Sequence, residues 1–229
     1  MSADDQTYVQ ALALGVEPAW RRASDEDRQA DGRQLLDAVA DAASDGVRGV
    51  TYSSIGLQPG VDLILWRMAP SIDALETAAA RLLRSGLGRW MTVRHSLIGR
   101  VGASQYVKKP TEQEQSLFAG ERLRYLVVYP FTKSAEWYLL SREARQGVMN
   151  EHMRVGHEYP MVRQLLAYSF GLDDQDFVVA YETDDLAAFG DLVRALRATE
   201  SRRSTVGDTP ILLGLHRPVE EILGILGAS

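Results

Sequence analysis

The sequence predicts an α+β protein made of two tandem ferredoxin-like (β-α-β-β-α-β) domains, a fold of the dimeric α+β-barrel type. The first sign is an internal repeat, because "PAWRRASDEDRQ" and "AEWYLLSREARQ" carry Trp, Ser, Glu and Arg at equal offsets. The second is a pair of later segments, "VDLILWRMAPSIDALETAAARLL" and "QDFVVAYETDDLAAFGDLVRALR", each of which reads as a β-run followed by a helix. A polar stretch, "SQYVKKPTEQEQSLFAGERLR", separates the two copies.

The elements of both halves follow in the same order, as strands rich in Val, Ile, Leu and Tyr and as helices with apolar residues at helical spacing. The first half is predicted to contain strands over 7–16, 47–55, 61–68 and 91–101 and helices over 24–45 and 71–85. The second half is predicted to contain strands over 123–130, 165–171, 176–182 and 208–215 and helices over 141–158 and 184–200, with a short helix after Pro218. One face of the helix over 184–200 carries Leu186, Phe189, Val193 and Leu196, and should cover a mostly antiparallel sheet.

The repeat predicts the division of the chain into domains. We expect an N-terminal domain over 1–105, a connection over 106–122 and a C-terminal domain over 123–229. Two sheets of this size would leave open edges and weak individual cores. We therefore expect them to pack against each other or against neighbouring chains, and we expect a homo-oligomer.

The composition removes several classes of site. The 229 residues contain no cysteine, which excludes disulfides, thiolate zinc sites, iron–sulfur clusters and cysteine nucleophiles. The net charge is −6 and the basic residues are scattered, which argues against a nucleic-acid-binding face and favours a small-molecule partner. The apolar runs are too short to span a membrane and the acidic start resembles no secretory signal, so we expect a cytoplasmic protein.

The helix over 141–158 carries two of the four histidines. The first of them, His152, shares a helix face with Ala144, Val148, Met149 and Val155, so its ring should point inward. The equivalent position in the first half holds Leu35, so packing alone did not require an imidazole. Such a residue is either a hydrogen-bonded core histidine or the single axial ligand of a haem-type iron, and it is a poor zinc site. His157, at the helix end, is interpreted as a capping or solvent-exposed residue.

Four segments of the second half carry a family resemblance. They are "YPFTKSAEWYLL", the histidine-bearing helix, "YSFGLDDQDFVVAYETDDL" and "LRATESRRSTVGDTPILLG". In this order they resemble the chlorite dismutase family, and within it the coproheme decarboxylases, over nearly all of residues 120–215. The resemblance implies a double ferredoxin-like protomer, usually assembled as a homopentamer, with one iron porphyrin bound in the C-terminal half.

The resemblance also implies roles for residues around the porphyrin. His152 corresponds to the proximal iron ligand, Glu200 to a carboxylate that hydrogen-bonds this ligand, and Trp137 to a residue that lines the proximal side. On the opposite side, efficient chlorite-degrading members carry an arginine where this chain has Gln164, with Arg163 adjacent. A neutral amide stabilises an oxychlorine anion less well than a guanidinium, which argues against chlorite chemistry.

The "YPFTK" motif implies the reaction. In coproheme decarboxylases its tyrosine, here Tyr129, is the radical that abstracts hydrogen from a propionate, and the lysine four residues later, here Lys133, supports the reaction. We therefore expect an oxidoreductase that uses hydrogen peroxide to convert iron coproporphyrin III, at once substrate and redox centre, into haem b. The alternatives are a chlorite dismutase or weak haem peroxidase, and a non-catalytic haem-binding protein.

Overall fold

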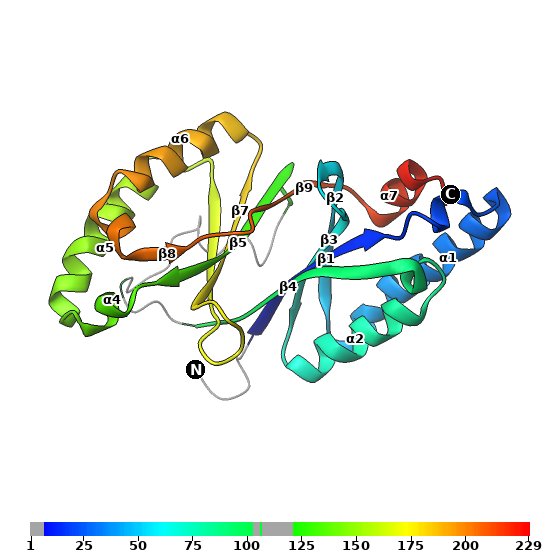
Figure 1. Ribbon diagram of the computed structural model, residues 1–229, viewed down its shortest axis with the longest axis horizontal. Helices are drawn as coiled ribbons and strands as arrows, with labels where there is room; N and C mark the ends of the chain where they lie inside the picture. Colours follow the sequence, from blue (N-terminus) through cyan, green and yellow to red (C-terminus); the bar gives the residue numbers. More distant parts are fainter. Residues whose placement is uncertain (1–6, 103–105, 107–120) are drawn as a thin grey trace. The chain divides into compact units, whose positions relative to one another are not determined.

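The computed structural model describes residues 7–102, 106 and 121–229 (Figure 1). The chain divides into two compact units, one formed by residues 1–101 together with 213–229 and the other by residues 102–212. The predicted connection over 106–122 lies outside the described residues except for Tyr106, Glu121 and Arg122.

The first unit contains the complete β-α-β-β-α-β order that the sequence predicts. Its elements are β1 (Thr7–Val16), α1 (Asp25–Asp41), β2 (Arg48–Gln58), β3 (Val61–Ala69), α2 (Ile72–Arg84) and β4 (Met91–Val101). The strands lie in the order β4-β1-β3-β2, and every one of these pairs is antiparallel. This is the ferredoxin-like arrangement, so the predicted fold class is confirmed.

The second unit repeats this plan. Its elements are β5 (Tyr125–Lys133), α4 (Ala135–Leu139), α5 (Arg142–His157), β6 (Arg163–Tyr168), β7 (Phe177–Thr183), α6 (Leu186–Arg197) and β8 (Thr205–Gly207). The strand order is β6-β7-β5-β8, again with antiparallel pairs. Helices α5 and α6 lie together on one side of these strands (Figure 1).

The repeated sequence letters have the same structural role in both units. Ser24 and Ser141 are the N-caps of α1 and α5, and each side chain accepts a hydrogen bond from the backbone N–H three residues later. This cap satisfies a donor that the helix itself cannot pair. The two repeated tryptophans, Trp20 and Trp137, are both buried.

The end of the chain differs from the prediction. The expected strand over 208–215 begins later, as β9 (Leu212–His216), while the short strand β8 ends at Gly207 before the predicted start. Pro210, which has no N–H for a ladder, lies between β8 and β9. Strand β9 pairs with β2, through Tyr52 and His216. Helix α7 (Val219–Leu226) follows, and residues 213–229 therefore belong to the first unit rather than to a C-terminal domain over 123–229.

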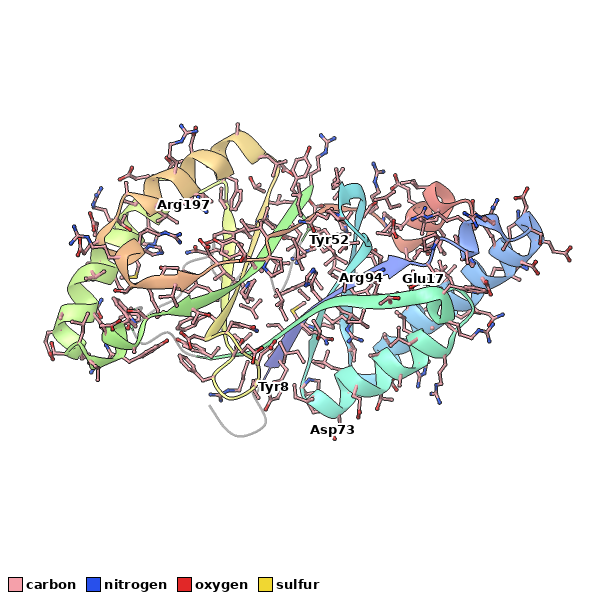
Figure 2. The ribbon with its side chains drawn as sticks, in the orientation of Figure 1. Tyr8, Glu17, Tyr52, Asp73, Arg94 and Arg197 are labelled. Carbon is pink, nitrogen blue, oxygen red and sulfur yellow. The ribbon has the colours of Figure 1, made fainter. Side chains whose placement is uncertain are left out.

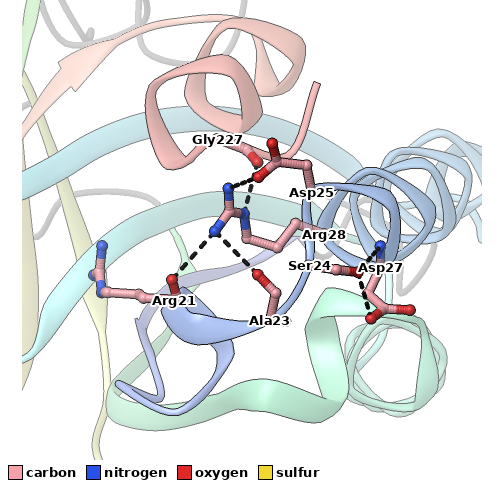
Figure 3. A network of polar contacts seen from close by, with 7 residues as sticks. All are labelled: Arg21, Ala23, Ser24, Asp25, Asp27, Arg28 and Gly227. Carbon is pink, nitrogen blue, oxygen red and sulfur yellow. Dashed lines mark hydrogen bonds and ion pairs between the residues drawn. The ribbon is translucent and has the colours of Figure 1, made fainter.

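Apolar packing explains where the terminal helix lies. The core of the first unit includes Leu14, Trp20 and Leu35 together with Val219, Ile222, Leu223 and Leu226 of α7. Arg28 fixes the end of this helix, because its Nε donates to the carbonyl of Gly227 at 3.1 Å (Figure 3). Burying four apolar side chains of α7 stabilises this position by several kcal/mol, at about 1.5–3 kcal/mol for each.

Candidate active site

One face of the second unit's sheet carries the predicted functional residues. Tyr129 and Lys133 lie on the same face of β5. Tyr129 is paired with Val179 of β7, and Val179 is paired with Leu166 of β6, so these side chains share that face. Contacts of Lys133 and Tyr181 with the residues around α5 and α6 show that the helices cover this face. The cover is incomplete, since Leu166 remains 44% exposed. We call this surface the helix-side face.

His152 projects from α5 toward this face. Its Nδ1 lies 3.0 Å from the Oγ of Ser201. Burial, together with a smaller contribution from the positive charge of Lys133, lowers the pKa of His152 to about 4. The imidazole is therefore neutral at neutral pH, the form in which a histidine coordinates a metal. No hydrogen bond reaches its Nε2 from any residue within 7–102, 106 or 121–229.

The residue that contacts this imidazole is not the one the sequence predicts. Glu200 is exposed, and its carboxylate forms an ion pair with Arg203 at 3.3 Å. Its backbone N–H donates to Glu151 at 3.0 Å. The neighbouring Ser201 is buried and supplies the contact to Nδ1, because this position of the short helix over 200–204 faces α5 whereas position 200 faces outward.

Lys133 is a buried cation beside the same serine. Only 8% of its surface is exposed, and its Nζ donates to the carbonyl of Ser201 at 2.9 Å. The ammonium also lies 4.5 Å from the ring centre of buried Trp137, a cation–π distance. Burial lowers the pKa of Lys133 to about 8, with a further contribution from the charge of Arg202. Lys133, Trp137 and His152 thus meet around Ser201.

Tyr129 lies on the same face and pairs with a second tyrosine. The rings of Tyr129 and Tyr181 stack with centres 5.9 Å apart, and the side chain of Tyr181 influences the pKa of Tyr129. Burial raises the pKa of Tyr129, so the phenol keeps its proton at neutral pH. Tyr181 is buried between Tyr129 and Phe189 of α6.

A charged cluster lies close enough to act on Tyr129. Arg202 bonds Asp208 at 2.6 Å, and Arg197, which projects from α6 (Figure 2), lies 3.7 Å from the same carboxylate. The charges of all three residues contribute to the pKa of Tyr129. With two cations and one anion, this end of the face favours an anionic ligand.

The structure separates the two candidates for the distal residue. Gln164 lies opposite Tyr181 in the β6–β7 ladder and therefore shares the helix-side face, since alternate residues of a strand point to opposite faces. Arg163 belongs to the opposite face, and its guanidinium donates to the carbonyl of Glu121 at 2.7 Å. His157 is exposed, in agreement with its interpretation as a helix-end residue.

Sequence reasoning missed four residues of this site: Tyr181, Arg197, Ser201 and Arg202. Tyr181 lies two residues after Val179, the strand partner of Tyr129, so strand alternation could have placed it on the same face. It lies outside the "YPFTK" motif that pointed to Tyr129. The other three lie within "LRATESRRS", where only the carboxylate had an expected role. A short 3-10 turn produces no periodic pattern of apolar residues in the sequence. The side of the turn that faces the site is therefore determined by three-dimensional packing.

Comparison with known proteins identifies the family. The model of the chlorite dismutase family matches residues 28–217. The chain belongs to the chlorite dismutase family. It is 34% identical over 186 residues to the coproheme decarboxylase of Mycolicibacterium smegmatis, which covers 79% of this chain and 77% of that protein. It is 25% identical over 227 residues to the chlorite dismutase of Ideonella dechloratans, which covers 96% of this chain and 79% of that protein.

Solved structures of the chlorite dismutase family agree with the fold over most of the chain. The chlorite dismutase from Candidatus Nitrospira defluvii in complex with imidazole is 28% identical and has a TM-score of 0.87, covering 96% of this chain and 95% of that one. A mutant of the same dismutase has a TM-score of 0.88 at the same identity and coverage. The named relatives are enzymes.

The residues of the helix-side face fit an iron porphyrin. A neutral imidazole whose Nε2 accepts no hydrogen bond from a described residue could bind the iron, and the porphyrin would supply four further nitrogens. No group of three His, Asp or Glu side chains that could hold a bare metal ion occurs in the described part of the chain. None of the helices in that part is long and apolar enough to cross a membrane.

Proposed function

We propose that this protein decarboxylates iron coproporphyrin III oxidatively with hydrogen peroxide and yields haem b. The observation that carries the proposal is the joint position of Tyr129, Lys133 and neutral His152 on one partly uncovered face. The similarity to a coproheme decarboxylase over 79% of the chain supports it. For each propionate the balance is R–CH2–CH2–COO⁻ + H2O2 + H⁺ → R–CH=CH2 + CO2 + 2 H2O, and two propionates react.

The roles follow from the chemistry of each side chain. His152 would hold the iron through Nε2, and the bound iron porphyrin would supply the redox centre that peroxide oxidises. Tyr129 would first lose an electron and its hydroxyl proton to the oxidised redox centre, and as a phenoxyl radical would then take a hydrogen atom from the propionate carbon chain. Burial keeps the phenol protonated before this step. Arg197 and Arg202 would bind the propionate carboxylate beside Tyr129, because guanidinium groups pair with carboxylates through two hydrogen bonds.

Lys133 would supply the proton that the balance requires. A lysine whose pKa is lowered to about 8 gives up a proton more readily near neutral pH than an ordinary lysine, and regains it from solvent. Its carbonyl contact at Ser201 and its position over Trp137 fix the ammonium at the end of β5. Trp137 would then act by positioning Lys133 and by lining the proximal side.

Chlorite dismutation is the second candidate, because the solved relatives with a TM-score near 0.9 are chlorite dismutases. The neutral side chain of Gln164 argues against it, since a guanidinium is the better partner for an oxychlorine anion. A weak haem peroxidase and a non-catalytic haem-binding protein are the remaining outcomes of the test below.

We also infer that the protein is cytoplasmic and that it assembles as a homopentamer. Light scattering would measure the number of subunits.

The test adds iron coproporphyrin III to the purified full-length chain and titrates hydrogen peroxide. Porphyrin masses are followed by mass spectrometry alongside the Soret band. Stepwise loss of two carboxyl groups, through a three-propionate intermediate, is the expected result. Tight binding without a mass change would refute the decarboxylase proposal, and oxygen release from chlorite under the same conditions would support dismutation instead.

A further inference from the structure

Ser201 connects the two halves of the candidate active site. Its side chain is 4% exposed, its Oγ lies 3.0 Å from Nδ1 of His152, and its carbonyl accepts from Nζ of Lys133 at 2.9 Å. A second hydroxyl stands behind it, since the Oγ1 of Thr199 lies 3.0 Å from the Oγ of Ser201. Thr199 is also buried.

The direction of this hydrogen-bond chain is fixed at its far end. The hydroxyl of Thr199 donates to the carbonyl of Leu196 at 2.7 Å, and a carbonyl has no hydrogen to give. With its one hydrogen used, the Thr199 oxygen can only accept from Ser201. The Ser201 hydroxyl then has no hydrogen left for the ring, so the contact at 3.0 Å is a donation from Nδ1–H to the serine oxygen. The opposite arrangement would leave two oxygen lone pairs facing each other.

We propose that Ser201, supported by Thr199, is the positioning residue that holds His152 in the Nδ1–H tautomer and leaves Nε2 as the metal-binding atom. The iron-binding consequence rests on the proposed function, whereas the tautomer does not. The acceptor is a neutral hydroxyl in place of a carboxylate, since Glu200 points outward to Arg203. A neutral acceptor draws the Nδ1 proton less strongly, so it makes the imidazole a weaker donor to iron than a carboxylate partner would.

The first unit provides an internal comparison. The offset between Trp20 and Trp137 places Leu35 at the position of His152. The offset between the later repeated segments, Asp62 to Asp176, places Leu87 at the position of Ser201. Both leucines are fully buried and belong to one apolar core. The ferredoxin-like fold therefore accepts an apolar pair at these two positions. The second unit carries a polar pair there, and burying it is unfavourable unless both members are bonded.

The other charged groups near the ring leave this assignment intact. Glu151 is adjacent in sequence and raises the pKa of His152, but its carboxylate accepts from the backbone of Glu200 at 3.0 Å. Lys133 contributes a positive charge and has no acceptor for Nδ1–H. Among the described residues, the one hydrogen-bond partner of the ring is thus Ser201.

The test reads the tautomer directly in the full-length chain without added porphyrin. Two-bond 1H–15N correlation of 15N-histidine-labelled protein at neutral pH separates a protonated from an unprotonated ring nitrogen. We expect protonated Nδ1 and unprotonated Nε2 in the wild type and in Ser201→Thr, which keeps the hydroxyl. Ser201→Ala should shift the Nε2 signal toward the protonated value, and Thr199→Val, which keeps the shape, should shift it less.

A protonated Nε2 in the wild type would overturn the proposal, and so would an unchanged spectrum in Ser201→Ala. If a variant fails to fold, the wild-type spectrum still decides. With iron coproporphyrin III added, Ser201→Ala should bind about 10–100-fold more weakly than Ser201→Thr, the usual effect of losing a partner behind a metal ligand. An Nδ1–H tautomer in a chain that binds no porphyrin would refute the proposed function and leave the tautomer assignment standing.

Discussion

Asp176 accepts a hydrogen bond of 2.7 Å from the backbone N–H of Lys133, at the point where β5 ends. The first unit contains the same bond, 2.8 Å long, between Asp62 and the backbone N–H of Val16. A carboxylate that receives the last N–H of the first strand is thus part of the repeated fold. In the second unit this structural bond also fixes the residue that carries the buried ammonium.

We expect Asp176→Ala to lower the free energy of unfolding by about 1–3 kcal/mol, because a partly buried N–H loses its acceptor. The same variant should slow decarboxylation, since Lys133 is no longer held in place. Asp62→Ala is the matched control, with a comparable loss of stability in the first unit. Urea unfolding and the peroxide assay measure the two effects, and equal activity losses in both variants would contradict the positional role.

Replacement of His152 tests the proposed iron ligand. We expect His152→Ala to lose the Soret band of bound iron coproporphyrin III, because it removes the neutral imidazole that faces the sheet. His157→Ala, five residues along the same helix and exposed, should keep the band. A normal Soret band and affinity in His152→Ala would show that His152 is a core histidine.

The two stacked tyrosines predict different phenotypes. Tyr129→Phe should bind iron coproporphyrin III normally and lose more than about 99% of decarboxylation, since a phenyl ring has no hydroxyl hydrogen to exchange. Tyr181→Phe keeps the stacked ring and removes only the hydroxyl whose interaction influences Tyr129, so it should slow the reaction while retaining product. Mass spectrometry after single-turnover mixing with peroxide distinguishes the two. Normal turnover by Tyr129→Phe would remove that residue from the chemistry.

The fold was predictable because its signals are periodic or repeated. The repeated residues Ser24 and Ser141 are both helix N-caps, and Trp20 and Trp137 are both buried. The repeat in the sequence therefore corresponds to a repeat in the structure. The terminal segment was not predictable in this way. The short helix after Pro218 was expected. Its packing against the first unit results from an apolar cluster that joins residues far apart in the chain. Such packing leaves no local pattern.

The residues of the candidate site also fall into those that a periodic pattern predicts and those that tertiary packing determines. The inward direction of His152 was predictable because the helix period determines it, and strand alternation explains why Gln164 shares the helix-side face with Tyr181. Glu200 was assigned the contact that Ser201 makes, one residue later in a short turn without a dependable period. Arg197 and Arg202 join the site because the fold brings their charges near enough to Tyr129 of β5 to influence its pKa, and only tertiary structure supplies this proximity.

The lowered pKa of Lys133 predicts a pH dependence. The folded value is about 8 and the ordinary value 10.5, so between these limits the unfolded chain binds more protons and stability rises with pH. Below pH 8 the folded protein bears the full cost of the buried charge. Lys133→Met should therefore be more stable than the wild type at pH 7, by up to about 3 kcal/mol, with the difference shrinking from pH 8 to 10.5. Unfolding at three pH values measures it, and a pH-independent difference would contradict the assignment.

Helix α7 explains why the repeated fold offers one such face. In the first unit the equivalent helix, α1, is covered by the terminal segment, and a Cβ added at Gly32 would lie 2.4 Å from the carbonyl oxygen of Ala228. We expect Gly32→Ala to displace this segment and to cost about 1–3 kcal/mol, as overpacking does. Gly190→Ala in α6, where an added Cβ meets nothing within 4 Å, should instead gain about 0.5–1 kcal/mol from helix propensity.

Neither glycine variant changes the helix-side face, so both should bind iron coproporphyrin III with wild-type affinity. Thermal unfolding and Soret titration of Gly32→Ala measure stability and binding separately. If Gly32→Ala were as stable as Gly190→Ala, displacing the terminal segment from α1 would not lower the free energy of unfolding. Loss of porphyrin binding in Gly32→Ala alone would mean that the first unit, in which Leu35 replaces the histidine, also contributes to the ligand site.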